Sequence, residues 1–223
     1  HHVGEDLCLA SLGAAVDGAP VHMRPCGSGA HAFLLSREGP FPDGHGAFLG
    51  VNLGGWLVME SWMWPAEMEA NHIHDEYSYI EKYGGPADPQ AKSRMHEHWD
   101  TFLRPEHLDS LRRFGVTHVR IPFGYWLLDQ VYNESDGFVA GGEPYLARAL
   151  GWLKQRGMHA VLDLHALPGG QARRQSFTGR ITPVEHFFLE DHEFERGKRA
   201  VRAMVELAQK YQAAAWTRRM LSR

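Results

Sequence analysis

Residues 144–165, PYLARALGWLKQRGMHAVLDLH, decide the fold class of this chain. Leucine recurs in the first part of this stretch at helical spacing, at Leu146, Leu150 and Leu153. This spacing predicts a helix over Pro144–Arg156, which Gly157 ends. His159–Leu164 is a short apolar run, typical of a strand buried in a parallel sheet. A helix that leads into such a strand is half of a βαβ unit.

The same alternation extends outward in both directions. Apolar runs predict strands over Phe48–Leu53 and Val116–Pro122. Residues 90–114 have helical periodicity, with Pro105 at the first position of a second helix. Glu193–Tyr211 predicts a further helix, whose apolar stripe is Phe194, Val201, Met204, Val205, Ala208 and Tyr211. Strands that alternate with helices predict an α/β fold with a parallel sheet.

Two architectures are compatible with this order, a (β/α)₈ barrel and an open doubly wound sheet. No Gly-x-Gly-x-x-Gly follows a predicted strand, so the sequence gives no support for dinucleotide binding. Polar residues stand at the carboxyl ends of the predicted strands, namely Asn52, Arg120, Asp163 and His165. These positions form the active face of a barrel, which favours the barrel.

The composition is that of a globular protein: 223 residues, 43% hydrophobic and 22% charged, with a net charge of −4. The mild acidity gives no electrostatic footprint for nucleic acid, and no apolar run reaches the length of a membrane span. The chain begins with His1-His2, and no leader is visible.

Residues 1–45 differ from the remainder, because they are rich in Gly, Ala, Pro and Ser and contain both cysteines. We expect a small β-rich segment and linker over 1–45, followed by a barrel domain over 46–223. Asp17-Gly18 is a turn signal between Cys8 and Cys26, which indicates a hairpin that one disulfide would staple. Two unpaired thiols are the alternative. Residues 7–33 also resemble one repeat of a ricin-type lectin.

Five motifs resemble glycoside hydrolase family 5 in its exo-β-1,3-glucanase branch. They are GVNLGGWLVME (50–60), DEY (75–77), EHWDTF (97–102), HVRIPFGYW (118–126) and LDLHALPGGQ (162–171). The resemblance implies a (β/α)₈ barrel that cleaves β-glucosidic bonds with retention and releases glucose from β-glucan chain ends. It implies no cofactor. With the cysteines, it implies an extracellular or cell-wall location.

The resemblance also implies roles for individual residues. Arg120 would hydrogen-bond a catalytic carboxylate and keep it ionised, or form a salt bridge at the barrel mouth. His165 would contact the sugar, or be a satisfied core histidine. Glu60 would bind sugar hydroxyls, or be a solvated turn charge. Tyr125 would stack on the sugar or belong to the core, and Trp56 is expected in the core.

The chain departs from the family in its catalytic groups. Retaining hydrolysis needs two carboxylates about 5–5.5 Å apart. The family supplies them as glutamates at the ends of strands four and seven, and we expect both to lie beyond residue 223. Only three of eight strands are assigned here, and the one Asn-Glu pair, Asn133-Glu134, is interpreted as a turn. Ala172–Arg180 also lacks the carboxylate that the family places near the sugar.

We therefore expect the N-terminal piece of a glucanase that is inactive alone. The alternatives are a non-catalytic glucan-binding fragment and a mis-terminated gene product. No metal site is expected, because the histidines of His96-Glu97-His98 diverge on a helix and no His-Glu-x-x-His is present.

Overall fold

The computed structural model describes residues 7–11, 21–25, 49–63, 68 and 73–211. The chain divides into two compact units, His1–Ala47 and Phe48–Arg223. In the first unit, β1 (Leu7–Ser11) and β2 (Val21–Pro25) form an antiparallel pair in which Cys8 lies opposite Arg24. Cys26 lies outside the described residues, as does most of the lectin-like stretch, so the disulfide and that resemblance stay predictions.

The second unit contains a parallel sheet of three strands in the order β3-β4-β5. They are β3 (Gly50–Asn52), β4 (His118–Gly124) and β5 (His159–Ala166). The predicted α/β class with a parallel sheet is confirmed for these strands. The strand β4 begins two residues later than expected, because the Thr117 hydroxyl forms hydrogen bonds with the backbone of Leu49 just before it.

Six helices accompany the sheet among the described residues. They are α2 (Glu76–Lys82), α3 (Pro89–Phe102), α4 (Pro105–Arg113), α5 (Glu143–Gln155), α6 (His186–Leu189) and α7 (Asp191–Tyr211). Asp75 caps the first turn of α2 and Asp88 that of α3, each by accepting a hydrogen bond from a backbone N–H. Asn133 caps a short 3₁₀ turn, as predicted for Asn133-Glu134.

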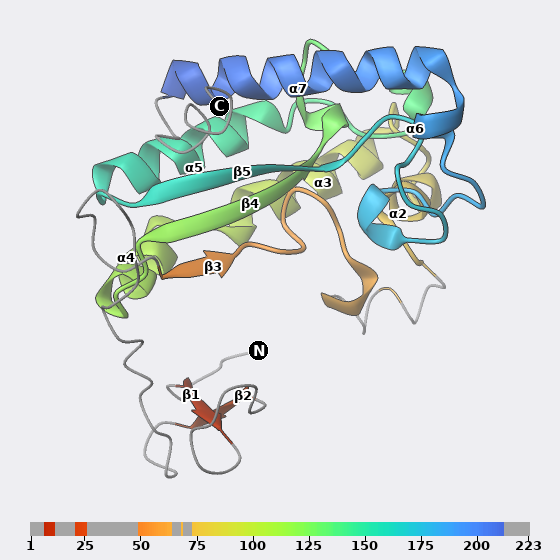
Figure 1. The fold of residues 1–223 in the computed structure, drawn as a ribbon. Coiled ribbons are helices and arrows are strands. Elements are labelled where there is room, and N and C mark those ends of the chain that lie inside the picture. Colours follow the sequence, from red (N-terminus) through yellow and green to blue (C-terminus); the bar gives the residue numbers. More distant parts are fainter. Residues whose placement is uncertain (1–6, 12–20, 26–48, 64–67, 69–72, 212–223) are drawn as a thin grey trace. The chain divides into compact units, whose positions relative to one another are not determined.

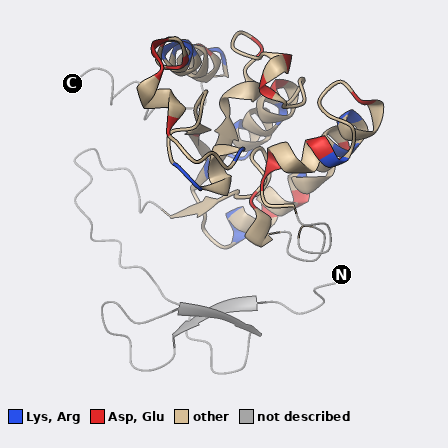
Figure 2. Ribbon diagram, turned by 90° about the vertical axis from the view of Figure 1, so that its right-hand side faces the viewer, with Lys and Arg blue, Asp and Glu red and all other residues tan. Residues whose placement is uncertain are grey.

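The helices leave one face of the sheet open to view. Figure 1 shows α3 and α5 behind the sheet and α7 running along β5. Lys and Arg alternate with Asp and Glu on the helices seen in Figure 2, so the described surface in that view has no face of a single charge. No helix among the described residues is long and apolar enough to cross a membrane.

The core behind the sheet is built around three fully buried tryptophans, Trp56, Trp99 and Trp126. The indole N–H of Trp56 donates to the backbone oxygen of Trp99 over 3.0 Å, so the ring is buried with its polar atom satisfied. This confirms the core position expected for Trp56.

The predicted apolar stripe of α7 is only partly right: Ala208 is buried, and Met204 and Tyr211 pack against the core. Phe194 and Val201 are exposed, and the buried residues are Gly197, Ala200, Ala203, Leu207 and Ala208. The reason is close approach: the Phe187 ring of α6 packs against Gly197, where a Cβ atom would overlap it. The helix therefore turns its small residues inward, which a count of large apolar residues cannot reveal.

Candidate functional site

A polar cluster joins side chains of all three strands, from Asn52 at the end of β3 to His165 near the end of β5. Asn52 of β3 lies directly opposite Arg120 of β4 in the parallel register. The guanidinium of Arg120 donates to Asn52 Oδ1 over 2.7 Å and to Asp163 Oδ2 of β5 over 2.6 Å. The side chain of Arg120, at the third position of β4, therefore connects all three strands.

His165 completes this cluster. Its Nδ1 lies 2.8 Å from Asp163 Oδ2 and 3.4 Å from Arg120 Nη2. Gln171 donates to the backbone oxygen of His165 and accepts from the backbone N–H of Leu167, which fixes the turn after β5. The predicted pair Arg120 and His165 is thus brought together, and sequence reasoning missed that Asp163 connects them.

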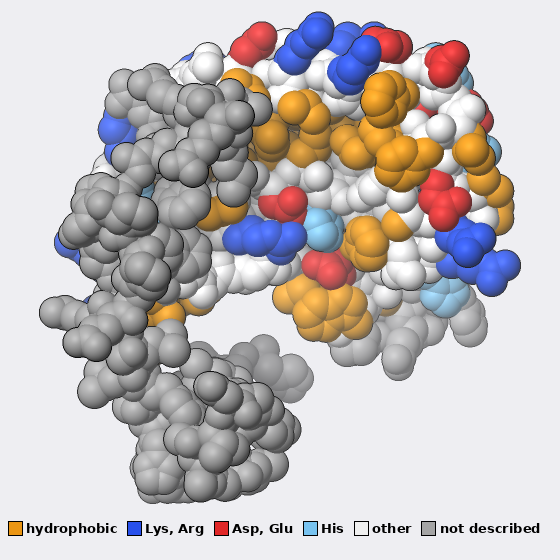
Figure 3. All heavy atoms as spheres, viewed as in Figure 1, with side chains coloured by type: hydrophobic (Ala, Val, Ile, Leu, Met, Phe, Trp, Pro, Cys, Tyr) orange, Lys and Arg blue, Asp and Glu red, His pale blue; other side chains and the backbone are white. Residues whose placement is uncertain are grey.

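The cluster remains open to solvent. The side chains of Arg120, Asp163 and His165 are 41%, 27% and 24% exposed. Figure 3 shows basic, acidic and histidine side chains gathered on the open face of the second unit. The Phe177 ring lies beside His165, with ring centres 5.2 Å apart, and adds an apolar surface. The cluster can thus be reached by a polar ligand.

Glu60 follows β3 and lies near this cluster. Its Oε2 accepts a 2.8 Å hydrogen bond from the indole of Trp62, whose side chain is largely exposed. Gly54 lies between Glu60 and Asn52: a Cβ there would be 3.2 Å from Glu60 Oε1 and 3.1 Å from Asn52 Nδ2. The absence of a side chain at Gly54 lets the carboxylate and the amide approach the same space.

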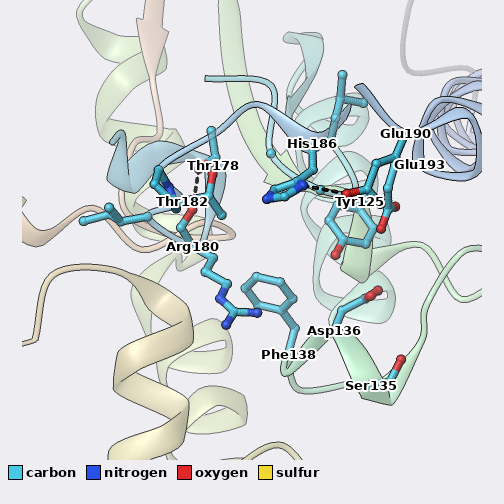
Figure 4. A pocket seen from close by; sticks show the side chains of 15 residues that line it. Tyr125, Ser135, Asp136, Phe138, Thr178, Arg180, Thr182, His186, Glu190 and Glu193 are labelled. Carbon is cyan, nitrogen blue, oxygen red and sulfur yellow. Dashed lines mark hydrogen bonds and ion pairs between the residues drawn. The ribbon is translucent and has the colours of Figure 1, made fainter. Parts of the chain in front are cut away.

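Tyr125 lies elsewhere, in the wall of a cavity of about 380 Å³. Figure 4 shows Tyr125, Phe138, Arg180 and His186 around it, with Asp136, Glu190 and Glu193 along one side. Tyr125 is 4% exposed, and burial followed by the charge of Asp136 raises the pKa of its hydroxyl. The tyrosine is therefore a protonated core residue that also lines the cavity, and its stacking on a sugar stays a prediction.

The carboxylates on the acidic side of this cavity already have partners within the chain. Arg196 of α7 pairs with both oxygens of Asp136 and, over 2.9 Å, with Glu193 Oε2. Burial opposes the charge of Arg196, but the hydrogen bond and charge of Asp136 outweigh it and raise the pKa of the guanidinium. This network fastens α7 to the loop after β4.

Glu76 is a functional candidate to which sequence reasoning gave no role, although it belongs to the motif DEY (75–77). It is fully buried, and its carboxyl accepts hydrogen bonds of 2.9 Å from the backbone N–H of Met59 and from the indole of Trp126. Burial raises the pKa of Glu76 to about 8; the two hydrogen bonds lower it, and the charge of Asp75 raises it further. Its place in the first turn of α2, after a capping Asp75, looks like an ordinary exposed helix start.

A metal site requires several ligand atoms close together. Among the described residues, such atoms lie within 4.8 Å of one another at Glu190, His192 and Glu193. Other partners already engage them. His186 Nδ1 lies 2.6 Å from Glu190, and Arg196 binds Glu193. Acidic residues are also favourable at a helix start, where α7 begins. These contacts account for the positions of the three side chains without a metal ion.

Comparison with known proteins places these residues in a chemical context. No family model matches the chain. Residues of the chain are 33% identical over 161 positions to a probable glucan endo-1,6-beta-glucosidase B of Aspergillus flavus. They are 37% identical over 168 positions to a glucan 1,3-beta-glucosidase of Pichia angusta, and 39% over 142 positions to one of Blumeria graminis. This chain is a homologue of glucan β-glucosidases. The predicted resemblance to glucan β-glucosidases is thus confirmed.

The matches cover part of each protein. They span 70%, 74% and 62% of this chain but only 40%, 35% and 32% of those three relatives. Among solved structures, a rutinosidase from Aspergillus niger superposes with a TM-score of 0.62 at 23% identity, covering 74% of this chain and 48% of that one. A second structure, AoRut, gives a TM-score of 0.61 at 24% identity, covering 73% of this chain and 44% of that one. This chain therefore shares the fold of about half of each of these two solved chains.

Proposed function

We propose that the Arg120 cluster, defined as Asn52, Arg120, Asp163 and His165, binds the terminal glucosyl residue of a β-glucan together with Glu60. The observation that carries the proposal is the partly exposed set of charge-linked side chains that three neighbouring parallel strands bring together. It occurs in a homologue of enzymes named for glucan β-glucosidase activity. We further propose that the second unit is the N-terminal part of a (β/α)₈ barrel.

The chemistry of the cluster suits a sugar. Hydroxyl groups both donate and accept, and the cluster offers guanidinium donors, carboxylate acceptors and an imidazole within a few ångströms. Arg120 and Asp163 hold each other in fixed orientation, so a ligand meets a preorganised site. The exposed ring of Trp62, 69% accessible beside Glu60, offers a flat apolar surface to a pyranose.

Turnover requires more than these residues. Retaining hydrolysis needs a nucleophile and an acid/base, about 5–5.5 Å apart. Asp163 is bound by Arg120 and His165, which suits a structural anion better than a nucleophile. We propose that the catalytic glutamates belong to sequence outside these 223 residues, and that this chain binds glucan without cleaving it. The polymeric substrate supports an extracellular or cell-wall location, with Cys8 and Cys26 paired.

Calorimetric titration with a laminari-oligosaccharide tests the binding. We expect Arg120→Met to weaken the affinity by tenfold or more, since a charged hydrogen bond to a hydroxyl is removed. Arg113→Met is the matched control, because Arg113 lies on the exposed face of α4 and donates to Ser110. Equal affinities for the two variants would contradict the proposal.

An aryl β-glucoside tests the expected lack of turnover. Glucose release by the pure chain that is unchanged by Glu60→Gln would show that the catalytic groups lie among these residues, in a place we have not identified. Binding without release is the expected result.

A further inference from the structure

Three loops surround the candidate site, each following one strand of the sheet. Glu60 lies in the loop after β3, Trp126 directly after β4, and residues 179–181 in the loop after β5. Loops of this kind position functional groups only when something holds them to one another. The dipeptide Asp75-Glu76 contacts all three.

Glu76 holds the first two loops. Its Oε2 accepts the backbone N–H of Met59, next to Glu60, and its Oε1 accepts the indole N–H of Trp126, both over 2.9 Å. Glu76 is fully buried and Trp126 is too, so neither bond competes with water. The backbone of Glu60 also forms an isolated antiparallel bridge with Asp75.

Asp75 holds the third loop. While Oδ1 caps α2, Oδ2 accepts the backbone N–H of Ile181 over 2.6 Å. The following residue adds two contacts: the backbone N–H of Tyr77 donates to Gly179 over 2.9 Å, and the guanidinium of Arg180 lies 3.9 Å from the centre of the Tyr77 ring. Both oxygens of Glu76 and Oδ2 of Asp75 thus join segments that lie apart in the sequence, while Oδ1 of Asp75 caps its own helix.

We propose that Asp75 and Glu76 are positioning residues, which hold Glu60 beside the Arg120 cluster by fastening its loop to the loops after β4 and β5. The inference rests on the proposed function for its sugar readout. Glu60 needs such support because its own side chain has one described hydrogen bond, from the exposed Trp62. Without the hydrogen bonds to Asp75 and Glu76, the loop of Glu60 would move. The Glu60 carboxylate would then leave its position across Gly54 from Asn52.

Hydrogen exchange measures the fastening itself. Glu76→Met removes both acceptors and keeps the side-chain volume, so exchange at the Met59 amide should rise by tenfold or more. Exchange at Ile121 in the middle of β4 should stay unchanged. Glu76→Gln keeps one acceptor oxygen and should restore part of the protection. Unchanged exchange at Met59 in Glu76→Met, or an equal rise at Ile121, would overturn the proposal.

Asp75 has a matched control in the same fold. Asp75→Ala and Asp88→Ala each remove an N-cap, of α2 and of α3, but only Asp75 also binds the amide of Ile181. Exchange at Ile181 should therefore rise in Asp75→Ala and not in Asp88→Ala. The same rise in both variants would assign the effect to lost capping and would count against the proposal.

A double-mutant cycle on laminari-oligosaccharide affinity tests whether Glu76 acts through Glu60. Glu76→Gln serves if Glu76→Met fails to fold by circular dichroism. We expect the Glu76 variant to weaken affinity about as much as Glu60→Gln does, and to add nothing in the Glu60→Gln background. Additive losses would overturn the positioning role.

The two proposals fail in different ways. If Arg120→Met leaves affinity unchanged, or if the chain binds no oligosaccharide, the proposed function fails, and the exchange of Met59 and Ile181 alone decides whether the loops are fastened. If Arg120→Met loses affinity while the Glu60 and Glu76 losses add, only the positioning role fails.

Discussion

At the scale of single residues, the buried carboxyl of Glu76 makes a prediction about pH. Its pKa of about 8 in the folded chain exceeds the 4.5 of an unperturbed glutamate, so the folded state binds the proton more tightly. The contribution to stability is therefore complete below pH 4.5 and is lost as the pH rises toward 8, by up to roughly 1.4 kcal/mol per pH unit. Glu76→Gln should remove this slope.

Urea unfolding at pH 5 and pH 8 checks this prediction through the difference between the wild type and Glu76→Gln. Charged groups that both proteins share cancel in that difference. Asp75 is the charged neighbour of Glu76, and Asp75→Asn should move the steep part of the wild-type curve to lower pH. Parallel curves for the wild type and Glu76→Gln would show that the carboxyl is ionised throughout.

The residues of the candidate site were only partly predictable. Arg120 and His165 could be placed together for two reasons. Both belong to family motifs, and both lie on predicted strands of one parallel sheet. Asp163 was recognised as a strand-end residue but not as their link, since its role depends on side-chain direction. Glu76 was given no role, because nothing local to Asp75-Glu76 shows that Trp126, 50 positions away, will cover it.

At the scale of elements, two glycines test how tightly the loop after β5 packs. Gly179 and Gly157 both have positive φ, at 80° and 65°. A Cβ at Gly179 would overlap the Trp126 ring, whereas nothing lies within 4 Å of one at Gly157. We expect Gly157→Ala to cost about 1 kcal/mol and Gly179→Ala about 1–3 kcal/mol more. Equal losses in thermal unfolding would contradict this packing.

Gly151 makes the opposite prediction. It lies inside α5, and no atom comes within 4 Å of an added Cβ. Gly151→Ala should therefore stabilise the chain by about 0.5–1 kcal/mol, since glycine loses more backbone entropy in a helix than alanine. A rise in the melting temperature checks this, and a fall would indicate that the helix is strained there.

The positions of most helices and strands along the chain could be predicted, but the side that a helix buries could not. Apolar runs and helix end signals located β4, β5, α3, α4, α5 and α7 to within a few residues, because these signals are local. The short helices α2 and α6 were not predicted. The buried face of α7 was only partly predicted, because Phe187 comes so close that only Gly197 and its small neighbours fit. This contact depends on how α6 packs against α7, so the sequence of α7 alone does not predict it.

At the scale of the whole molecule, apolar residues remain uncovered near the junction of α6 and α7. Phe188 and Leu189 are 66% and 69% exposed. Exposed apolar clusters favour association. We expect Phe188→Lys with Leu189→Lys to reduce light scattering at rising protein concentration.

Phe114 is the matched control, because it is equally exposed, at 69%, but lies alone after α4. Phe114→Lys should change the scattering little. If it reduces scattering as much as the double variant, the effect is one of added charge alone.

The guanidinium of Arg120 has a consequence for how the site comes into being during folding. From its place on β4 it donates to Asn52 of β3 and to Asp163 of β5, so its hydrogen bonds are complete only when the three strands are aligned. Pairing shifted by one residue would turn the polar side chains to the opposite face. The ligand-ready arrangement therefore arises in the same cooperative step as the sheet, and a partly folded chain does not contain a weaker version of it.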